Sequence, residues 1–302
     1  MKKITSVVLA FALCALTSFA QTLPSLLVGS DVASQGSAST AVGKTSGAYS
    51  LEGNVASMPL AGERLSAAAS FGLWQPDYAG NKVLGAGVAT RLGGRFALGL
   101  QFKSLLQPSY DVATESGSVL ESFTPGETNV ALGAAYSVTD WLSVGLTGRM
   151  VRSVLAEEAK AAVFGADVAV FLKKGAFSAG LSVNNVGGKV NYGGADYDQP
   201  MLAKAGAAYR FGDPESSSVT PSVEADILFK GGFMAGVGVE YSFKGILFAR
   251  GGFHYGDREK AVPTYASLGL GARLKGVSLD LAWLTASDVL GNSLSVGVGY
   301  SF

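Results

Sequence analysis

The chain has 302 residues, of which 48% are hydrophobic and only 15% are charged, and its formal net charge is zero. A soluble secreted protein normally carries about 25% charged residues, so this composition disfavours an ordinary water-soluble domain. The balanced charge offers no basic surface to nucleic acid, and Cys14 as the only cysteine excludes a disulfide framework and a cysteine metal site.

Residues 1–20 are predicted to be a signal peptide. Lys2 and Lys3 form a basic start, an apolar run covers 7–16, and Ser18-Phe19-Ala20 provides a small-x-small cleavage site. That run is too short to span a bilayer, and no later stretch reaches the ~18 apolar residues of a membrane helix. A hydropathic, exported chain without membrane helices favours a closed β-barrel in the outer membrane of a Gram-negative cell.

Residues 21–63 show no alternation and are rich in Ser, Ala and Gly, with Asp31, Glu52 and Asn54 spaced through them. This segment is either disordered or folded into the lumen of the barrel that follows. We expect a plug, because a wide barrel leaves an interior that its own small side chains do not fill.

From residue 64 to 302 apolar residues alternate with Gly, Ala, Ser and scattered charges. Strands of about 9–13 residues are the length that a tilted transmembrane strand needs. The alternation predicts an all-β fold, a fourteen-stranded antiparallel transmembrane barrel. The apolar stripes fall at 65–73, 84–92, 96–102, 130–138, 142–150, 164–172, 177–183, 201–211, 221–229, 233–243, 246–256 (ambiguous in phase), 264–274, 277–285 and 292–302.

The last stripe shows the alternation most clearly, with Leu294, Val296 and Val298 on one face and Ser or Gly on the other. In a soluble sandwich the apolar face would point inward, whereas in a membrane barrel it faces lipid. Charges such as Arg149 and Asp167 share the opposite phase, which favours a polar lumen. Tight turns alternate with longer connections, which predicts a periplasmic end with the tight turns and an extracellular end with the longer connections. The longer connections fall at 105–126, 153–160, 187–199 and 257–263.

No constellation predicts catalysis, a metal site or a cofactor. His254 is the only histidine. Glu224 and Asp226 could pair as catalytic carboxylates, but we expect them to face the lumen and to balance the charge of Lys230. Gly236-Val237-Gly238 lacks the helix of a dinucleotide loop, so these glycines are expected beside a plug or a close backbone.

Asn184, Asn185 and Tyr192 lie at the mouth of the 187–199 connection and are the best candidates for a partner or ligand surface. The alternative is that this Asn-rich stretch simply ends a strand. Trp283 has the lipid-facing phase of an interfacial aromatic, whereas Trp74 and Trp141 have the lumen phase.

The sequence also resembles a known family. Residues 29–56, GSDVASQGSASTAVGKTSGAYSLEGNVA, look like the N-terminal segment of FadL-like outer-membrane proteins, with Asn54-Val55-Ala56 in place of Asn-Pro-Ala. Residues 181–192, LSVNNVGGKVNY, are similar to an N-x-G-x-K-hydrophobic-x-Y stretch of the PorV/PorQ branch. Residues 200–211, PMLAKAGAAYRF, fit the same pattern.

The PorV/PorQ resemblance implies a fourteen-strand barrel with an N-terminal plug and an accessory role in type IX secretion or surface attachment. Its partners would be outer-membrane lipid, secretion-system subunits and secreted cargo proteins. The short loops of this chain depart from that role. The FadL resemblance implies the alternative function, passive transport of small hydrophobic molecules. A barrel enzyme is a third class of function, but no group of residues in the sequence points to a catalytic site.

Overall fold

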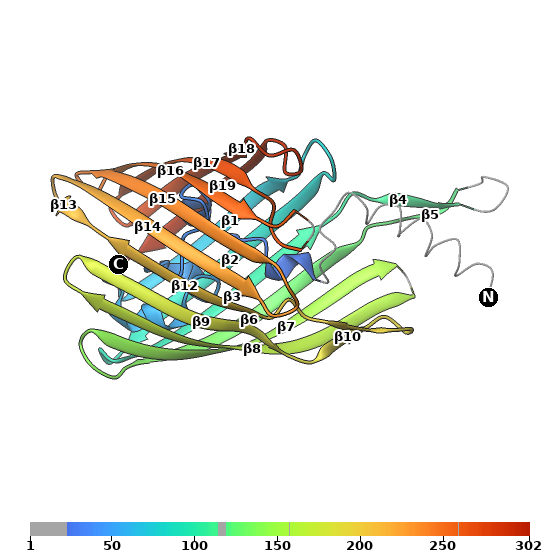
Figure 1. The fold of residues 1–302 in the computed structure, drawn as a ribbon, viewed down its shortest axis with the longest axis horizontal. Coiled ribbons are helices and arrows are strands. Elements are labelled where there is room, and N and C mark those ends of the chain that lie inside the picture. Colours follow the sequence, from blue (N-terminus) through green and yellow to red (C-terminus); the bar gives the residue numbers. More distant parts are fainter. Residues whose placement is uncertain (1–22, 114–118, 157, 259) are drawn as a thin grey trace.

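The computed structural model describes residues 23–113, 119–156, 158–258 and 260–302, so the expected signal peptide lies outside the described residues. Within those ranges the chain forms one β-barrel with a few short helical turns inside it (Figure 1). None of the helices in the described ranges is long and apolar enough to cross a membrane.

The barrel wall confirms the predicted fold class. β12 and β13 are consecutive pieces of one wall strand, and both pair with β14, so the wall has fourteen strands, all antiparallel to their neighbours. These strands are β1 Leu65–Trp74, β2 Asn81–Leu92, β3 Phe96–Leu106, β6 Gly126–Ser137, β7 Leu142–Ala156, β8 Ala159–Lys174, β9 Phe177–Gly187, β12 Leu202–Tyr209 with β13 Phe211–Asp213, β14 Ser217–Leu228, β15 Phe233–Phe243, β16 Leu247–Gly256, β17 Tyr265–Leu274, β18 Val277–Thr285 and β19 Ser293–Ser301.

The first and last wall strands close the sheet. Ser66 lies opposite Ser301 and Leu73 opposite Leu294 in the β1–β19 ladder. Phe302 extends this seam, because its carbonyl oxygen accepts the backbone N–H groups of Arg64 and Leu65 at 2.6 and 3.0 Å. The sheet therefore has no open edge, which is the condition for placing strands in lipid.

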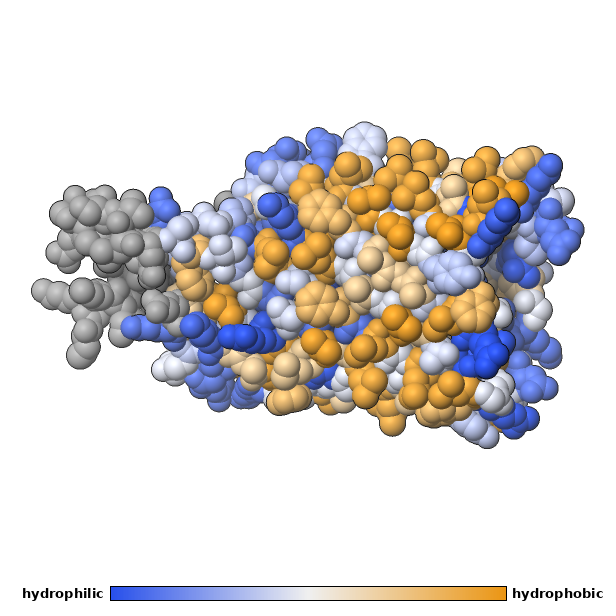
Figure 2. All heavy atoms as spheres, turned by 180° about the vertical axis from the view of Figure 1, so that it is seen from behind, coloured by the Kyte–Doolittle hydropathy of each residue, from blue (hydrophilic) through white to orange (hydrophobic). Residues whose placement is uncertain are grey.

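Apolar side chains cover the outer face of the wall. Leu294 and Val298 are 51% and 56% exposed, whereas Ser293 and Ser295, which alternate with them on β19, are buried. Figure 2 shows apolar residues over the middle of the barrel and polar side chains gathered toward its ends. This band has the polarity of a bilayer-spanning surface.

The structure also resolves which residues of 246–256 face outward, since Phe253 points outward and His254 inward.

The tryptophans divide by position. Trp283 is 41% exposed on the outer face, as its phase predicts. Trp74 is buried at the end of β1, and Trp141 is exposed in the turn before β7. Trp141 therefore has the lumen phase of β7 without lying in the lumen, because it precedes the first residue of that strand.

Two of the long connections carry hairpins that project from one end of the barrel (Figure 1). These are β4 Tyr110–Ala113 with β5 Val119–Phe123, and β10 Lys189–Asn191 with β11 Asp196–Asp198.

The connection expected at 153–160 is instead an extension of the wall. β7 and β8 stay paired as far as Ala156 opposite Ala159, so these strands are longer than their apolar stripes suggest.

The segment that precedes β1 lies largely inside the barrel (Figure 1), and we call residues 23–63 the plug. Its helical pieces are η1 Pro24–Leu26, α2 Val32–Gln35, η2 Gly47–Tyr49 and η3 Val55–Leu60. Val42, Ala56 and Ser57 in this segment have no exposed surface. The plug joins β1 directly, so the chain passes from the centre of the barrel into its wall.

The plug contacts the wall through glycines. At each of the glycines listed below, a Cβ atom added to the backbone would lie 3.1 Å or less from an atom of the plug. The wall or the plug would have to shift to make room for it. Ten of the fourteen wall strands contribute such glycines, namely Gly85, Gly87, Gly99, Gly133, Gly145, Gly180, Gly206, Gly236, Gly238, Gly252, Gly269 and Gly297. We call this set the glycine girdle. It explains the Gly-rich phase opposite the apolar stripes, because backbone or side-chain atoms of the plug occupy the space that a side chain of the wall would need.

We expect Gly180→Ala to shift the plug. A Cβ at this position would lie 2.1 Å from the carbonyl oxygen of Val42, which is backbone and cannot rotate away. Overpacking of this kind costs about 1–3 kcal/mol. The variant should show a higher ionic conductance than the wild type in planar bilayers. Gly148→Ala is the matched control, because nothing lies within 4 Å of its Cβ. Wild-type conductance in Gly180→Ala would contradict the expected tight fit.

Candidate functional site

Charged side chains anchor the plug to the wall, and the first anchor is Glu52 with Lys103. Lys103, on β3, lies 2.6 Å from Glu52 Oε1 and also donates to the Val28 carbonyl at 2.7 Å. Glu52 further accepts the Ser30 backbone N–H at 2.8 Å. Burial alone would raise the pKa of Glu52, but the attraction of Lys103 together with the hydrogen bonds from Lys103 and Ser30 outweighs burial and holds that pKa below its ordinary value.

The second anchor is Glu224 on β14. One of its carboxylate oxygens accepts the backbone N–H groups of Ala41 and Val42, at 2.7 and 2.8 Å. Its other oxygen lies 3.0 Å from Lys204 Nζ, and Asp226 lies 3.9 Å from the same ammonium. A wall carboxylate thus takes two plug N–H groups that would otherwise be buried without acceptors.

The expectation that Lys230 balances Glu224 and Asp226 is wrong. Lys230 lies beyond the end of β14, where it forms an exposed pair with Asp198 at 3.2 Å. Lys204 is the balancing charge because its position on β12 is directly opposite Asp226 on β14. The carboxylates do face the lumen, as their phase predicts.

The three plug residues singled out in the sequence hold the plug in place. Asn54 accepts the Ala56 N–H at the start of η3, and its amide donates to the Val170 carbonyl of the wall at 3.0 Å. Asp31 accepts the Ser34 N–H at the start of α2, and burial raises its pKa to about 6. Asp31 thus caps α2, Asn54 caps η3 and binds the wall, and Glu52 is anchored to the wall by Lys103.

Asn184 and Asn185 are buried rather than presented on a surface. Ser182 donates to the Asn184 side chain at 2.7 Å, and Asn185 donates from its amide to the Pro200 carbonyl at 2.9 Å. Asn185 also has a positive φ of 60°, where the β8–β9 register shifts. This irregularity within β9 has the form of a β-bulge, and Asn tolerates its positive φ better than most residues.

Tyr192 is half-buried, and its hydroxyl donates to Ser153 at 2.8 Å. It follows the β10 strand, and its ring contacts Tyr197 with centroids 6.2 Å apart. Of the three residues predicted as a partner surface, Tyr192 alone lies at the mouth of the barrel with exposed area. It remains a prediction for that role.

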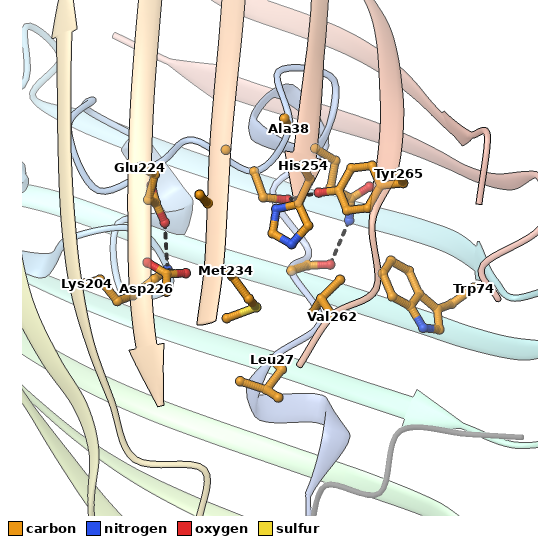
Figure 3. A pocket seen from close by; sticks show the side chains of 15 residues that line it. Leu27, Ala38, Trp74, Lys204, Glu224, Asp226, Met234, His254, Val262 and Tyr265 are labelled. Atoms are coloured by element: carbon orange, nitrogen blue, oxygen red, sulfur yellow. Dashed lines mark hydrogen bonds and ion pairs between the residues drawn. The ribbon is translucent and has the colours of Figure 1, made fainter. Parts of the chain in front are cut away.

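A cavity of about 60 Å³ lies between the plug and the wall strands β1, β12, β14, β15, β16 and β17. Figure 3 shows its labelled side chains, with Asp226 and Trp74 on either side of His254. The lining is partly polar and partly apolar. Its polar residues are Gln35, Ser39, Lys204, Glu224, Asp226 and His254, and its large apolar residues are Leu27, Trp74, Met234, Val262 and Tyr265.

Three buried polar atoms on the cavity lining have no hydrogen-bond partner in the described part of the chain. They are Gln35 Oε1, Asp226 Oδ1 and His254 Nε2. The His254 ring stacks on Tyr265 with centroids 4.7 Å apart, and Tyr265 shares a 2.9 Å hydrogen bond with Ser39. The site can therefore accept hydrogen bonds from donor groups and also contact apolar groups.

Sequence reasoning named His254, Glu224 and Asp226 but missed the residues that join them into a site. Lys204 could have been found by pairing the stripes at 201–211 and 221–229, which puts it opposite Asp226. Gln35 has no such signal, because the plug lacks periodicity. Tyr265 and Trp74 begin and end wall strands and come together only when the barrel closes.

Among the described residues no group of three or more His, Cys, Asp or Glu side chains is placed to hold a metal ion. Glu224 and Asp226 share the Lys204 ammonium, and Glu224 also binds the plug backbone. These contacts give Glu224 a structural role, and both carboxylates also line the cavity.

No protein-family model matches the chain, and no curated protein sequence matches it significantly. Solved structures do match. The Ralstonia pickettii toluene transporter TbuX has a TM-score of 0.64 at 14% identity, covering 91% of this chain and 98% of that one. The Pseudomonas putida toluene transporter TodX has 0.63 at 14%, covering 94% and 99%. A Pseudomonas aeruginosa FadL homologue has 0.58 at 13%, covering 91% and 99%.

At these identities the likeness is one of fold. The neighbours are FadL-family outer-membrane barrels, so the resemblance to FadL-like proteins is confirmed for the architecture. The finer resemblance to PorV/PorQ stays a prediction.

We expect Lys103→Met to loosen the plug, because it leaves the buried Glu52 carboxylate without its cation. Removing one partner of a buried pair costs about 3–5 kcal/mol. A Ser57→Cys reporter, buried in the wild-type structure, should then react with a maleimide faster. Adding Glu52→Gln should recover much of the protection. Lys82→Met, at an exposed position on β2, is the control. Unchanged labelling in Lys103→Met would show that this pair does not hold the plug.

Proposed function

We propose that this protein is an outer-membrane channel for passive transport of small hydrophobic molecules. The observation that carries the proposal is the partly apolar cavity between plug and wall, in a barrel whose fold matches transporters of toluene. A solute held there would be enclosed by the wall and released only by movement of the plug. The outer-membrane location is part of the proposal and is supported by the apolar outer band and the expected signal peptide.

The accessory role in type IX secretion has less support. Its motif at 181–192 contains Asn184 and Asn185, and both have local structural tasks at the β8–β9 irregularity. Those tasks explain the asparagines without a partner protein. No structural neighbour named above is a secretion component.

Passage of a ring-sized solute requires the plug to move. An engineered cavity of about 150 Å³ is needed to bind benzene, well above the 60 Å³ available beside the plug. The glycine girdle surrounds the rest of the plug closely. The structure is therefore a closed state of the proposed channel.

Uptake of the neutral hydrophobic dye 1-N-phenylnaphthylamine by whole cells tests the proposal. Gram-negative host cells that make the protein should accumulate the dye several-fold faster than cells with the empty vector, because the channel bypasses the outer leaflet. Uptake of the hydrophilic substrate nitrocefin should stay at the vector level, which controls for a leaking membrane. Equal dye uptake with and without the protein would refute transport of such molecules.

A disulfide between plug and wall tests whether the plug moves. The hydroxyl oxygens of Thr40 and Ser222 are 2.7 Å apart, so cysteines there come within reach of an S–S bond of about 2.0 Å. Oxidation of Thr40→Cys/Ser222→Cys should lower dye uptake to the vector level, and a reducing agent should restore it. Thr40→Cys alone is the control. Full uptake by protein with the disulfide verified would show that solutes pass without plug movement.

A further inference from the structure

We propose that the cavity beside the plug binds a primary ammonium group, so that the solute class includes small aliphatic amines. The inference deepens the proposed function. It rests on that function because it takes the cavity to be a place that a transported solute occupies on its way through the barrel. It starts from the three unpartnered atoms on the lining, Asp226 Oδ1, Gln35 Oε1 and His254 Nε2.

Asp226 is the centre of the site because its carboxylate lacks sufficient partners. It is 7% exposed, its Oδ2 lies 3.9 Å from Lys204 Nζ, and its Oδ1 has no hydrogen bond in the described structure. Lys204 is closer to Glu224, at 3.0 Å. A buried carboxylate that shares one cation with a second carboxylate leaves a net negative charge, and a further cation stabilises it.

The number of acceptors matches an ammonium. A primary ammonium has three N–H donors and no acceptor. Asp226 Oδ1 and Gln35 Oε1 are acceptors, and His254 Nε2 accepts when the ring carries its proton on Nδ1. The amide nitrogen of Gln35 donates to the Gly29 carbonyl at 2.7 Å. This hydrogen bond fixes the orientation of the amide and directs its Oε1 away from that carbonyl.

The apolar part of the lining suits a short carbon chain. Leu27, Met234 and Val262 provide aliphatic and thioether surface, and Trp74 and Tyr265 add aromatic surface. The volume of about 60 Å³ equals roughly four water-sized positions, which is the size of a molecule with four heavy atoms.

The same residues select against anions. A carboxylate entering the cavity would meet Asp226 and the Glu224 carboxylate, while the one ammonium on the lining, Lys204, is already bound to Glu224. Neutral alcohols can donate only one hydrogen bond and bring no charge. The expected order of affinity is therefore amine, then alcohol, then carboxylate.

Trp74 on the cavity lining provides the readout. Trp141→Phe/Trp283→Phe leaves it as the only tryptophan, since the chain contains three. The purified full barrel is titrated at about pH 8, where alkylamines are protonated, with n-propylamine, 1-propanol and propionate. We expect a saturable change in Trp74 fluorescence with n-propylamine, a weaker one with 1-propanol and none with propionate.

Asp226→Asn in this background should weaken n-propylamine binding about tenfold or more, because it removes a charge-assisted hydrogen bond. Gln35→Met removes a second acceptor at similar size and should weaken binding as well. It serves as an independent test if Asp226→Asn does not fold. Asp213→Asn, at an exposed position on β13, is the control.

The ammonium site is overturned if the parent protein shows no saturable change, if propionate binds as tightly as n-propylamine, or if both cavity variants bind like the control. Dye uptake by the same protein separates the two proposals. Uptake of the neutral dye without amine binding would overturn the ammonium site and leave the channel. Saturable amine binding without dye uptake would uphold the site and overturn the channel.

Discussion

The rest of the structure depends on closure of the backbone hydrogen-bond ladder. In lipid a strand cannot leave its N–H and C=O groups unpaired, so a spanning sheet has to return to its first strand. Here β1 pairs with both β2 and β19, and the Phe302 carbonyl completes the seam. Closure turns every second residue outward to the apolar band, and it places all the remaining residues on one enclosed surface. The charged anchors of the plug, the glycine girdle and the cavity all belong to that inner surface.

The inner surface uses two kinds of contact to hold the plug. Glycines allow the plug to approach the wall backbone closely, which gives a tight fit but does little to fix one position of the plug along the wall. Glu52, Glu224 and Lys103 supply the register, because each satisfies specific plug or wall groups by charge-assisted hydrogen bonds. The cavity lies where this arrangement is incomplete. Asp226 retains an oxygen that neither Lys204 nor the plug satisfies.

Much of the wall could be predicted from the sequence, because period-2 alternation is a local property. The stripes at 233–243 and 292–302 match β15 and β19 closely. The segment at 153–160 was misjudged because its residues lack a clear apolar stripe, although the ladder continues through it. The site could be predicted only in part. Glu224, Asp226 and His254 lie on regular strands with readable phase, but Gln35 lies in an aperiodic segment and Lys204 required the strand pairing. The three-residue surface of Asn184, Asn185 and Tyr192 depended on a backbone irregularity that polarity alone does not reveal.

The glycine girdle also constrains how the molecule assembles. The plug fills space that the wall encloses on all sides, and the seam that completes the enclosure joins the two ends of the barrel sequence, with Ser66 opposite Ser301. Because the wall and the plug fit this closely, and because the plug runs directly into β1, the position of residues 23–63 and the pairing of β1 with β19 constrain each other. Sequence changes at the girdle then affect the yield of closed barrels as well as the behaviour of the finished one.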